Sequence, residues 1–304
     1  MSIRPAAASV AVALLAAWPR LAAAQACCAA TTLVSPVRLQ QMEQAGVGLR
    51  VRGRGIFGSF SGSGDYQTSP AGDVDVGQDL FAAARIGING QVALLLPFVQ
   101  TRRAISGLSS WGGGIGDLAV SGRYTLALPG EHPFLPGFSL QLGLSIPTGR
   151  SVADARDTLA TDATGTGTFA GTVGFDAQEI SGSWFVGFDG WVAKRVPGSG
   201  EIARQSLPLS FTAVLSGGFV FRNQATAGLF LTGQRQGASR DLTDGKTLTE
   251  SALALLTGGA GVIVPVDERW RLQATLTADI PVSGWGRNQL AGVGLTVSLC
   301  RLWL

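Results

Sequence analysis

The sequence lacks several features that most protein classes require. After residue 24 it has no uninterrupted apolar run long enough to cross a membrane as a helix. Only 14% of its 304 residues are charged, and lysine occurs only at Lys194 and Lys246, so the surface is too apolar for an ordinary soluble protein. Once Arg4 and Arg20 of the first 24 residues are set aside, 21 basic and 20 acidic residues remain. This balance excludes a basic surface for nucleic acid.

Histidine and cysteine are scarce, which argues against an enzyme, a metal site or a cofactor. The one histidine, His132, has no serine or aspartate that the sequence ties to it as in a hydrolase. Cys27, Cys28 and Cys300 have no histidine or further cysteine at metal-ligand spacing. They are either free thiols or form a disulfide that ties the N-terminal region to the last strand.

A helical membrane protein and a phosphate-binding protein are both disfavoured. The segments 205–221 and 251–266 lack charge over almost the length of a spanning helix, but both contain proline and paired glycines. The glycine runs 112–114 and 165–167 lack the strand, lysine and helix context of a phosphate-binding loop. We expect strands in the first two segments, and loops or strand edges in the glycine runs.

The first 24 residues have the form of a secretory signal peptide. Arg4 precedes an apolar run from Ala6 to Trp18 that is too short for a membrane span, and Ala22–Ala24 offers a small-residue cleavage site. We therefore predict a signal peptide at 1–24, a periplasmic leader or plug at 25–44, and an outer-membrane β-barrel at 45–304.

What the chain does have is an alternation of apolar and polar residues in about twelve segments. The clearest runs from Trp270 to Ile280, where every second residue is apolar, so a strand there has one apolar and one polar face. With a mean hydropathy of +0.28, this predicts an all-β protein, a transmembrane antiparallel up-and-down β-barrel of about 12 strands. We expect the strands near 45–61, 78–88, 91–103, 114–128, 138–147, 165–176, 181–195, 207–221, 224–235, 251–264, 270–280 and 289–302.

The connections between these segments alternate in length. Short turns are expected at 89–90, 177–180, 222–223 and 265–269, with a longer one at 129–137, whereas 62–77, 148–164, 197–206 and 236–250 read as long polar loops. Barrels of the bacterial outer membrane have short periplasmic turns and long external loops. Both ends of the barrel are therefore expected on the periplasmic side.

Charged residues within the strands are expected to face the lumen. Val47, Leu49 and Val51 share one strand face, which places Arg50, Arg52 and Arg54 on the other. An arginine that faced lipid would cost roughly 2–4 kcal/mol at the midplane. The candidate lumen-lining set on this parity is Arg50, Arg52, Arg54, Arg85, Asp117, Arg123, Asp189, Arg271 and Asp279. These residues form either a charge-paired interior that fills the barrel or an electropositive constriction that favours anionic solutes.

Three aromatic residues also have inward parity. Phe185, Trp191 and Phe230 alternate with the lipid-facing residues of their strands. Their inward orientation indicates either a hydrophobic path for a small solute or packing inside the barrel.

Two motifs carry a family resemblance. Gly114 to Leu118 reads G-x-G-D-L, and the strand that ends at Gly149 closes with L-x-L-x-x-P-T-G. In these motifs the chain resembles the outer-membrane barrels of the phenol-degradation meta-pathway family. The resemblance implies uptake of small hydrophobic compounds across the outer membrane.

These observations predict a monomeric outer-membrane channel or transporter for small hydrophobic or carboxylate-bearing solutes. A structural or assembly barrel that conducts nothing is the main rival, and an outer-membrane hydrolase is the weakest candidate. The expected partners are outer-membrane lipid, a small-molecule solute and the barrel assembly machinery.

Overall fold

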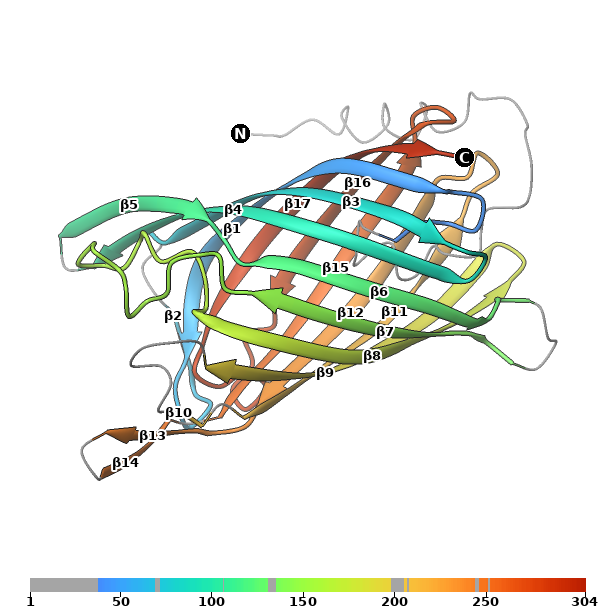
Figure 1. Cartoon of the computed structure of the whole chain (residues 1–304). Coiled ribbons are helices and arrows are strands. Elements are labelled where there is room, and N and C mark those ends of the chain that lie inside the picture. The colour runs from blue at the N-terminus through green and yellow to red at the C-terminus, as the bar shows by residue number, and fades with distance from the viewer. Residues whose placement is uncertain are drawn as a thin grey trace, which may run out of the picture.

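A computed structural model shows a closed antiparallel β-barrel (Figure 1). It describes residues 38–68, 72–105, 107–130, 135–197, 205–206, 208–243, 246–250 and 252–304. The strands are β1 (Ala45–Phe60), β2 (Tyr66–Thr68), β3 (Val74–Ile86), β4 (Gly90–Ile105), β5 (Leu108–Ile115), β6 (Leu118–Ala127), β7 (Gly137–Ile146), β8 (Thr168–Ser181), β9 (Trp184–Pro197), β10 (Gln205–Ser206), β11 (Leu209–Val220), β12 (Thr226–Gln236), β13 (Ser239–Thr243), β14 (Lys246–Glu250), β15 (Leu253–Pro265), β16 (Trp270–Asp279) and β17 (Gln289–Trp303).

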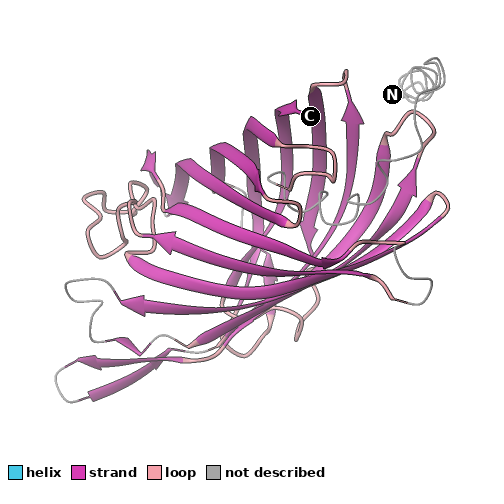
Figure 2. Ribbon diagram, turned by 45° about the vertical axis from the view of Figure 1, so that its right-hand side comes forward, coloured by secondary structure: helices cyan, strands magenta, loops and turns pink. Residues whose placement is uncertain are grey.

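Twelve strands close the barrel in the order β1, β3, β4, β6, β7, β8, β9, β11, β12, β15, β16 and β17, and β17 pairs back onto β1. The described part of the chain is drawn as strands and loops in Figure 2. Within the described ranges, no helix is long and apolar enough to span a membrane. The prediction of an all-β, twelve-stranded antiparallel barrel is confirmed.

The two ends of the barrel differ in their connections. Ala45 at the start of β1 pairs with Trp303 at the end of β17, so both ends of the barrel wall lie at one rim. At this rim β3–β4, β8–β9, β11–β12 and β15–β16 are joined by short turns, and we name it the short-turn end. The opposite rim, the long-loop end, carries the 147–167 loop and the small sheet of β10, β13 and β14.

Several predicted boundaries are wrong, and three of them show the physical reason. Residues 177–180 continue β8 and pair with β9, because Gly182, whose φ is +59°, makes the turn two residues later. The predicted strand 114–128 begins earlier, at Leu108, and breaks at Gly116–Asp117, so that β5 and β6 pair with the two halves of β4. The predicted loop 236–250 contains the β13–β14 hairpin.

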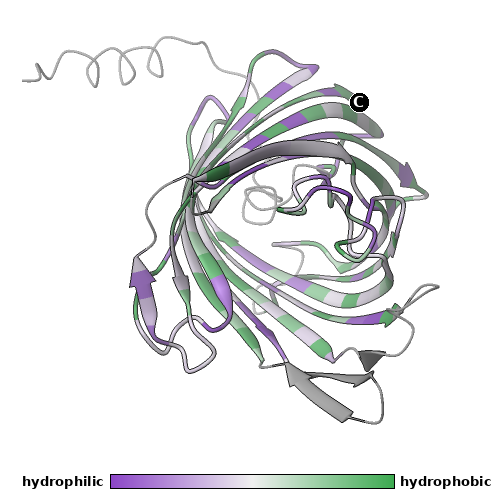
Figure 3. Cartoon of the chain, turned by 90° about the vertical axis from the view of Figure 1, so that its left-hand side faces the viewer, coloured by the Kyte–Doolittle hydropathy of each residue, from purple (hydrophilic) through white to green (hydrophobic). Residues whose placement is uncertain are grey.

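The two faces of the wall follow the alternation of the sequence, which is visible along the strands in Figure 3. Outward positions carry exposed apolar side chains such as Leu142, Leu229 and Leu295, as expected for contact with lipid. Outward aromatic residues gather near the short-turn end, where the ring centroids of Trp184 and Phe219 lie 5.1 Å apart. The chain is therefore a protein of the bacterial outer membrane.

Candidate functional site in the barrel lumen

Arg50, Arg52 and Arg54, which we call the arginine row, lie on the inner face of β1. Asp79 of β3 is fully buried and accepts hydrogen bonds from Nε of Arg50 at 2.6 Å and from Nε and Nη2 of Arg52 at 2.9 and 3.0 Å. Nη2 of Arg54 donates to Oδ2 of Asp279 on β16 at 2.7 Å. Three guanidiniums thus share two carboxylates, so these five side chains carry a net positive charge.

Glycines on neighbouring strands make room for this row. A Cβ atom at Gly77 would lie 2.8 Å from Nη2 of Arg52, and one at Gly292 would lie 2.8 Å from Nε of Arg54. The side chains of Arg52 and Arg54 remain 44% and 37% exposed, whereas that of Arg50 is 16% exposed. Two of the three charges are therefore accessible from the lumen.

A second ionic cluster lies nearer the short-turn end, around Asp176 of β8. Its carboxylate accepts hydrogen bonds from Nε and Nη2 of Arg123 at 2.9 and 3.0 Å and from Nε2 of Gln141 at 2.9 Å. Nη2 of Arg38 lies 3.4 Å from the same carboxylate. Arg123 also donates to the hydroxyl of Ser139. Arg123, which was predicted to face the lumen, is therefore part of a buried hydrogen-bond network.

Residues 38–44, which we call the inner segment, lie inside the barrel at the short-turn end. Arg85 donates to the backbone carbonyls of Gln40 and, at 2.9 Å, Glu43. Nη1 of Arg271 donates to Oε1 of Glu43 at 2.9 Å. Leu39 is buried in a cluster with Phe81, Ala83, Ala93, Cys300 and Leu302. Two residues of the predicted set, Arg85 and Arg271, therefore bind the inner segment, which precedes the barrel wall in the sequence.

Cys300 is buried within that apolar cluster and forms no disulfide with another described residue. Cys27 and Cys28 lie outside the described residues, as do His132 and the predicted signal peptide at 1–24. The disulfide therefore stays a prediction. Among the described residues, no group of histidine, cysteine and acidic side chains could hold a metal ion.

Asp117 lies in the break between β5 and β6 and binds the 147–167 loop. Its carboxylate accepts hydrogen bonds from the backbone of Gly149 at 3.1 Å, and from the backbone and hydroxyl of Thr166 at 2.7 and 2.8 Å. Gly112 contacts the same loop, because a Cβ there would lie 2.7 Å from the carbonyl carbon of Thr161. The glycine run of β5 therefore allows the 147–167 loop to pack closely against this strand.

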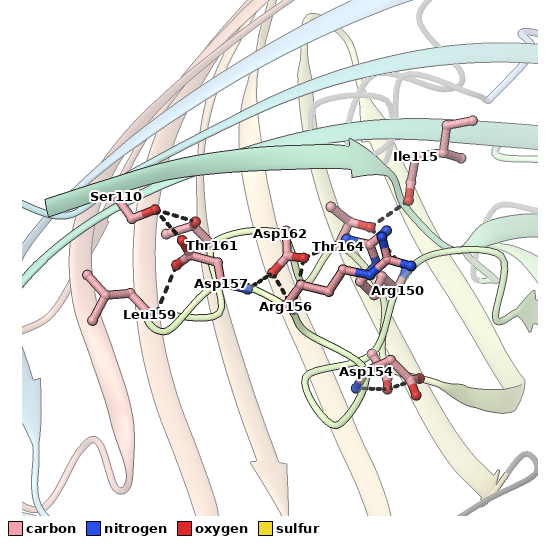
Figure 4. Close-up of polar contacts among 11 residues, drawn as sticks. Ser110, Ile115, Arg150, Asp154, Arg156, Asp157, Leu159, Thr161, Asp162 and Thr164 are labelled. Atoms are coloured by element: carbon pink, nitrogen blue, oxygen red, sulfur yellow. Dashed lines mark hydrogen bonds and ion pairs between the residues drawn. The ribbon is translucent and has the colours of Figure 1, made fainter.

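Aspartates hold the loop together (Figure 4). Asp162 accepts the backbone N–H of Arg156 at 3.0 Å and Nη1 of Arg150 at 2.5 Å. The N–H of Arg156 is the largest cause that lowers the pKa of Asp162 to about 2. Asp157 accepts the hydroxyl of Ser110 on β5 at 2.7 Å, which lowers the pKa of that carboxyl. The loop is therefore an ordered element fixed to the β4–β5 hairpin.

Asp189 of β9 is the remaining charged residue of the predicted set. It stands opposite Asp176 in the β8–β9 pair and is 2% exposed. Its Oδ2 atom has no hydrogen-bond partner in the part of the chain that the structure describes.

The three inward aromatic residues lie over glycines of neighbouring strands. A Cβ at Gly218 would lie 2.8 Å from the ring of Phe185, one at Gly174 would lie 2.8 Å from that of Trp191, and one at Gly259 would overlap that of Phe230. Phe185 and Phe230 are 2% and 9% exposed, whereas Trp191 is half-buried. Such aromatic–glycine pairs favour packing over a continuous hydrophobic path.

Three partners of the predicted residues were not themselves predicted. Asp79 and Asp176 have inward parity on their strands, so the alternation could have identified both. Glu43 precedes the first strand, and its contact with Arg271 joins residues 228 positions apart, for which the sequence carries no local signal.

The fold is shared with a solved outer-membrane protein, the COG4313 outer membrane channel from Pseudomonas putida F1, with a TM-score of 0.70 and 16% identity over 86% of this chain and 96% of the other. Weaker similarity, with TM-scores below 0.5, is found to the KdgM porin in complex with disordered oligogalacturonate (TM-score 0.46, 7% identity, 84% and 99% covered) and to a TodX monoaromatic hydrocarbon channel (TM-score 0.40, 9% identity, 91% and 93% covered).

No family model matches the chain, and no curated protein matches it. Fold similarity at 16% identity establishes an outer-membrane barrel and no finer family. The resemblance to the phenol-degradation meta-pathway family therefore stays a prediction from residues 114–149.

Proposed function

We propose that this protein is an outer-membrane channel or transporter for small solutes, and that its lumen favours solutes that bear a carboxylate. The short-turn end faces the periplasm in this proposal, as in other outer-membrane barrels. The shared fold with an outer membrane channel supports the general role.

The observation that carries the preference for carboxylates is the composition of the arginine row. Among the described residues, the three guanidiniums have Asp79 and Asp279 as their carboxylate partners, and the side chains of Arg52 and Arg54 are 44% and 37% exposed. Rings of arginine in a pore favour anions. Because the inward aromatic residues Phe185 and Phe230 are buried, a hydrophobic solute finds less complementary surface in the wall.

The main rival is a structural barrel that conducts nothing. The inner segment favours this rival, because it occupies the short-turn end and is bound there by Arg85 and Arg271. A hydrolase remains the weakest candidate, and we expect no enzymatic activity.

Conductance in planar lipid bilayers separates these functions. We expect the protein to conduct, with a reversal potential in a KCl gradient that indicates anion preference. Arg52→Gln should shift the reversal potential toward that of a cation-preferring pore, while Arg50 still pairs with Asp79. The matched control is the double variant Arg54→Gln with Asp279→Asn, which removes one positive and one negative charge.

A protein that does not conduct would favour the structural barrel. A conducting protein whose reversal potential is the same with and without Arg52 would refute the selectivity that we assign to the arginine row.

A further inference from the structure

A cavity of about 340 Å³, which we call the mouth cavity, lies between the inner segment and the barrel wall at the short-turn end. Arg38 and Leu39 form one side of it, and residues of β6, β7 and β8 form the other. Its volume is at the small end of the range for ligand pockets. The cavity is separate from the arginine row, on which the proposed selectivity depends.

The mouth cavity has an excess of positive charge. Arg38, Arg85 and Arg123 line it, and Asp176 is the one acidic residue of its described lining. Arg85 donates to three backbone carbonyls, which bear no net charge. Asp189 of β9 is paired with Asp176 across the β8–β9 ladder and does not line the cavity. Even when Asp189 is counted as ionised, three guanidiniums stand against two carboxylates.

Two side chains of this lining are buried with unused hydrogen-bonding groups. Gln178 is 1% exposed, and neither Oε1 nor Nε2 of its amide has a partner in the described part of the protein. Arg38 is 6% exposed, and its Nε and Nη1 also have none there. Asp176 already accepts hydrogen bonds from Arg123 and Gln141, and lies 3.4 Å from Arg38. Buried groups of this kind are normally hydrogen-bonded, so their concentration around one cavity indicates a ligand.

The remaining lining gives the cavity an apolar side. Leu39, Leu128 and Pro129 border it, and Leu39 is buried in the apolar cluster of the inner segment. A ligand that fits both sides has a compact apolar body and one anionic group.

We propose that the mouth cavity is a binding site for small organic monocarboxylates. Small rotations of the Arg38 and Gln178 side chains bring Nε, Nη1 and the amide Nε2 onto the carboxylate, and a water that enters with the anion donates to Oε1 of Gln178. The apolar body lies along Leu39 and Leu128. This inference rests on the proposed channel function and adds a place where the solute is held near the periplasmic rim.

Binding of benzoate to the full chain in detergent micelles tests the proposal, with isothermal titration calorimetry as the measurement. Benzamide and benzylamine, which share the ring but are neutral and cationic, are the control ligands. We expect the Kd of benzamide to be at least tenfold higher than that of benzoate, and no heat of binding from benzylamine. Equal Kd values for benzoate and benzamide would overturn the proposal.

The variant Gln178→Leu separates a ligand site from a structural role. Since the amide has no partner in the described part of the protein, its removal should leave the heat-denaturation midpoint unchanged or higher, and should raise the Kd of benzoate at least fivefold. Arg38→Gln should raise the Kd similarly. Thr172→Val is the matched control, because Thr172 lies on the same inward face of β8 but about 20 Å along the strand.

An unchanged Kd in both Gln178→Leu and Arg38→Gln would refute the site, as would a fall in the denaturation midpoint of Gln178→Leu with no change in Kd. Failure of the site and failure of the channel function can be distinguished. A barrel that conducts but does not bind benzoate refutes this inference alone, and one that binds benzoate but does not conduct refutes the channel.

Discussion

Arg54 and Asp279 form an ion pair that reaches across an intervening strand. Nη2 of Arg54 lies 2.7 Å from Oδ2 of Asp279, although β17 separates β1 from β16 in the sheet. Gly292 of β17 lies beneath the pair, and its N–H donates to the same carboxylate oxygen at 2.8 Å. The missing side chain at Gly292 therefore allows two strands that are not adjacent to share a charge pair.

Gly292→Ala should destabilise the barrel. The new Cβ would lie 2.8 Å from Nε of Arg54 and 2.8 Å from the carbonyl oxygen of Gly55, which is backbone and cannot turn away. We expect a loss of about 1–3 kcal/mol in the free energy of unfolding, measured by urea denaturation in lipid vesicles. Gly53→Ala is the control, because nothing lies within 4 Å of a Cβ there. Equal losses in the two variants would contradict this account.

Asp79→Asn should weaken the barrel and strengthen its preference for anions. The change removes the charge of the fully buried Asp79 and leaves the largely buried Arg50 without its carboxylate, which typically costs about 3–5 kcal/mol. The net charge of the arginine row and its partners would rise by one. Urea denaturation and the reversal potential measure the two effects. Asp75→Asn on the same strand is the control, because Asp75 is 29% exposed and its pair with Arg103 should contribute no more than about 1 kcal/mol. A similar loss in both variants would argue against burial as the cause.

The 147–167 loop should loosen in acid. The pKa of Asp162 is about 2 in the folded protein, below its ordinary value of 3.8, so its stabilising contribution is present above about pH 4 and is lost as the pH falls through 2. Cleavage of the loop by pepsin should therefore accelerate between pH 4 and pH 2 beyond the change in pepsin's own activity.

Asp162→Asn should loosen the same loop at neutral pH, where trypsin cleaves after Arg150 and Arg156. Asp154→Asn is the matched control, because Asp154 accepts the Ser151 hydroxyl within the loop and none of these backbone bonds. A loop equally resistant to trypsin in Asp162→Asn and the wild type would show that the carboxylate does not hold it.

Deletion of residues 25–42 should leave a folded barrel and raise its conductance. The deleted residues contribute no strand to the described barrel, whereas Leu39 and Arg38 are buried inside the short-turn end. Heat-modifiable migration on gels reports folding, and planar bilayers report conductance. Leu39→Asp, which disrupts the apolar cluster without shortening the chain, should raise the conductance in the same direction. Loss of the folded band on deletion would mean that the segment is part of the barrel structure.

Peptide tags should reveal the orientation of the barrel. Tags after Ser63, Val152 or Thr243 lie at the long-loop end and should bind antibody on intact cells. Val152 is 70% exposed, so a tag there should not disturb the hydrogen bonds that hold the loop. A tag at Asn89, in the turn between β3 and β4, should be reached only after permeabilisation. Labelling of Asn89 on intact cells would reverse the proposed orientation.

The alternation of apolar and polar residues was enough to predict the barrel, because successive residues of a strand face lipid and the water-filled lumen in turn. It also predicted the inward orientation of Arg50, Arg123 and Arg271. It could not predict which acidic residue pairs with each arginine. Arg123 on β6 reaches Asp176 on β8 across the intervening strand β7, and Glu43 lies in the inner segment, which is not part of the barrel wall. The turn predicted at 177–180 was wrong, because these residues continue β8 and the positive φ of the turn is supplied by Gly182.

The pairing of β1 with β17 also has a kinetic consequence. Every other neighbouring pair of wall strands joins segments close in the sequence, but this seam joins Ala45 to Trp303. Contacts of such long range form late in folding, because most of the intervening chain must first be ordered. Until β1 and β17 pair, both strands expose unpaired backbone N–H and C=O groups, which hydrocarbon cannot hydrogen-bond. We therefore expect seam closure to be the final and slowest step of insertion, and substitutions at the seam to slow assembly more than they change the finished barrel.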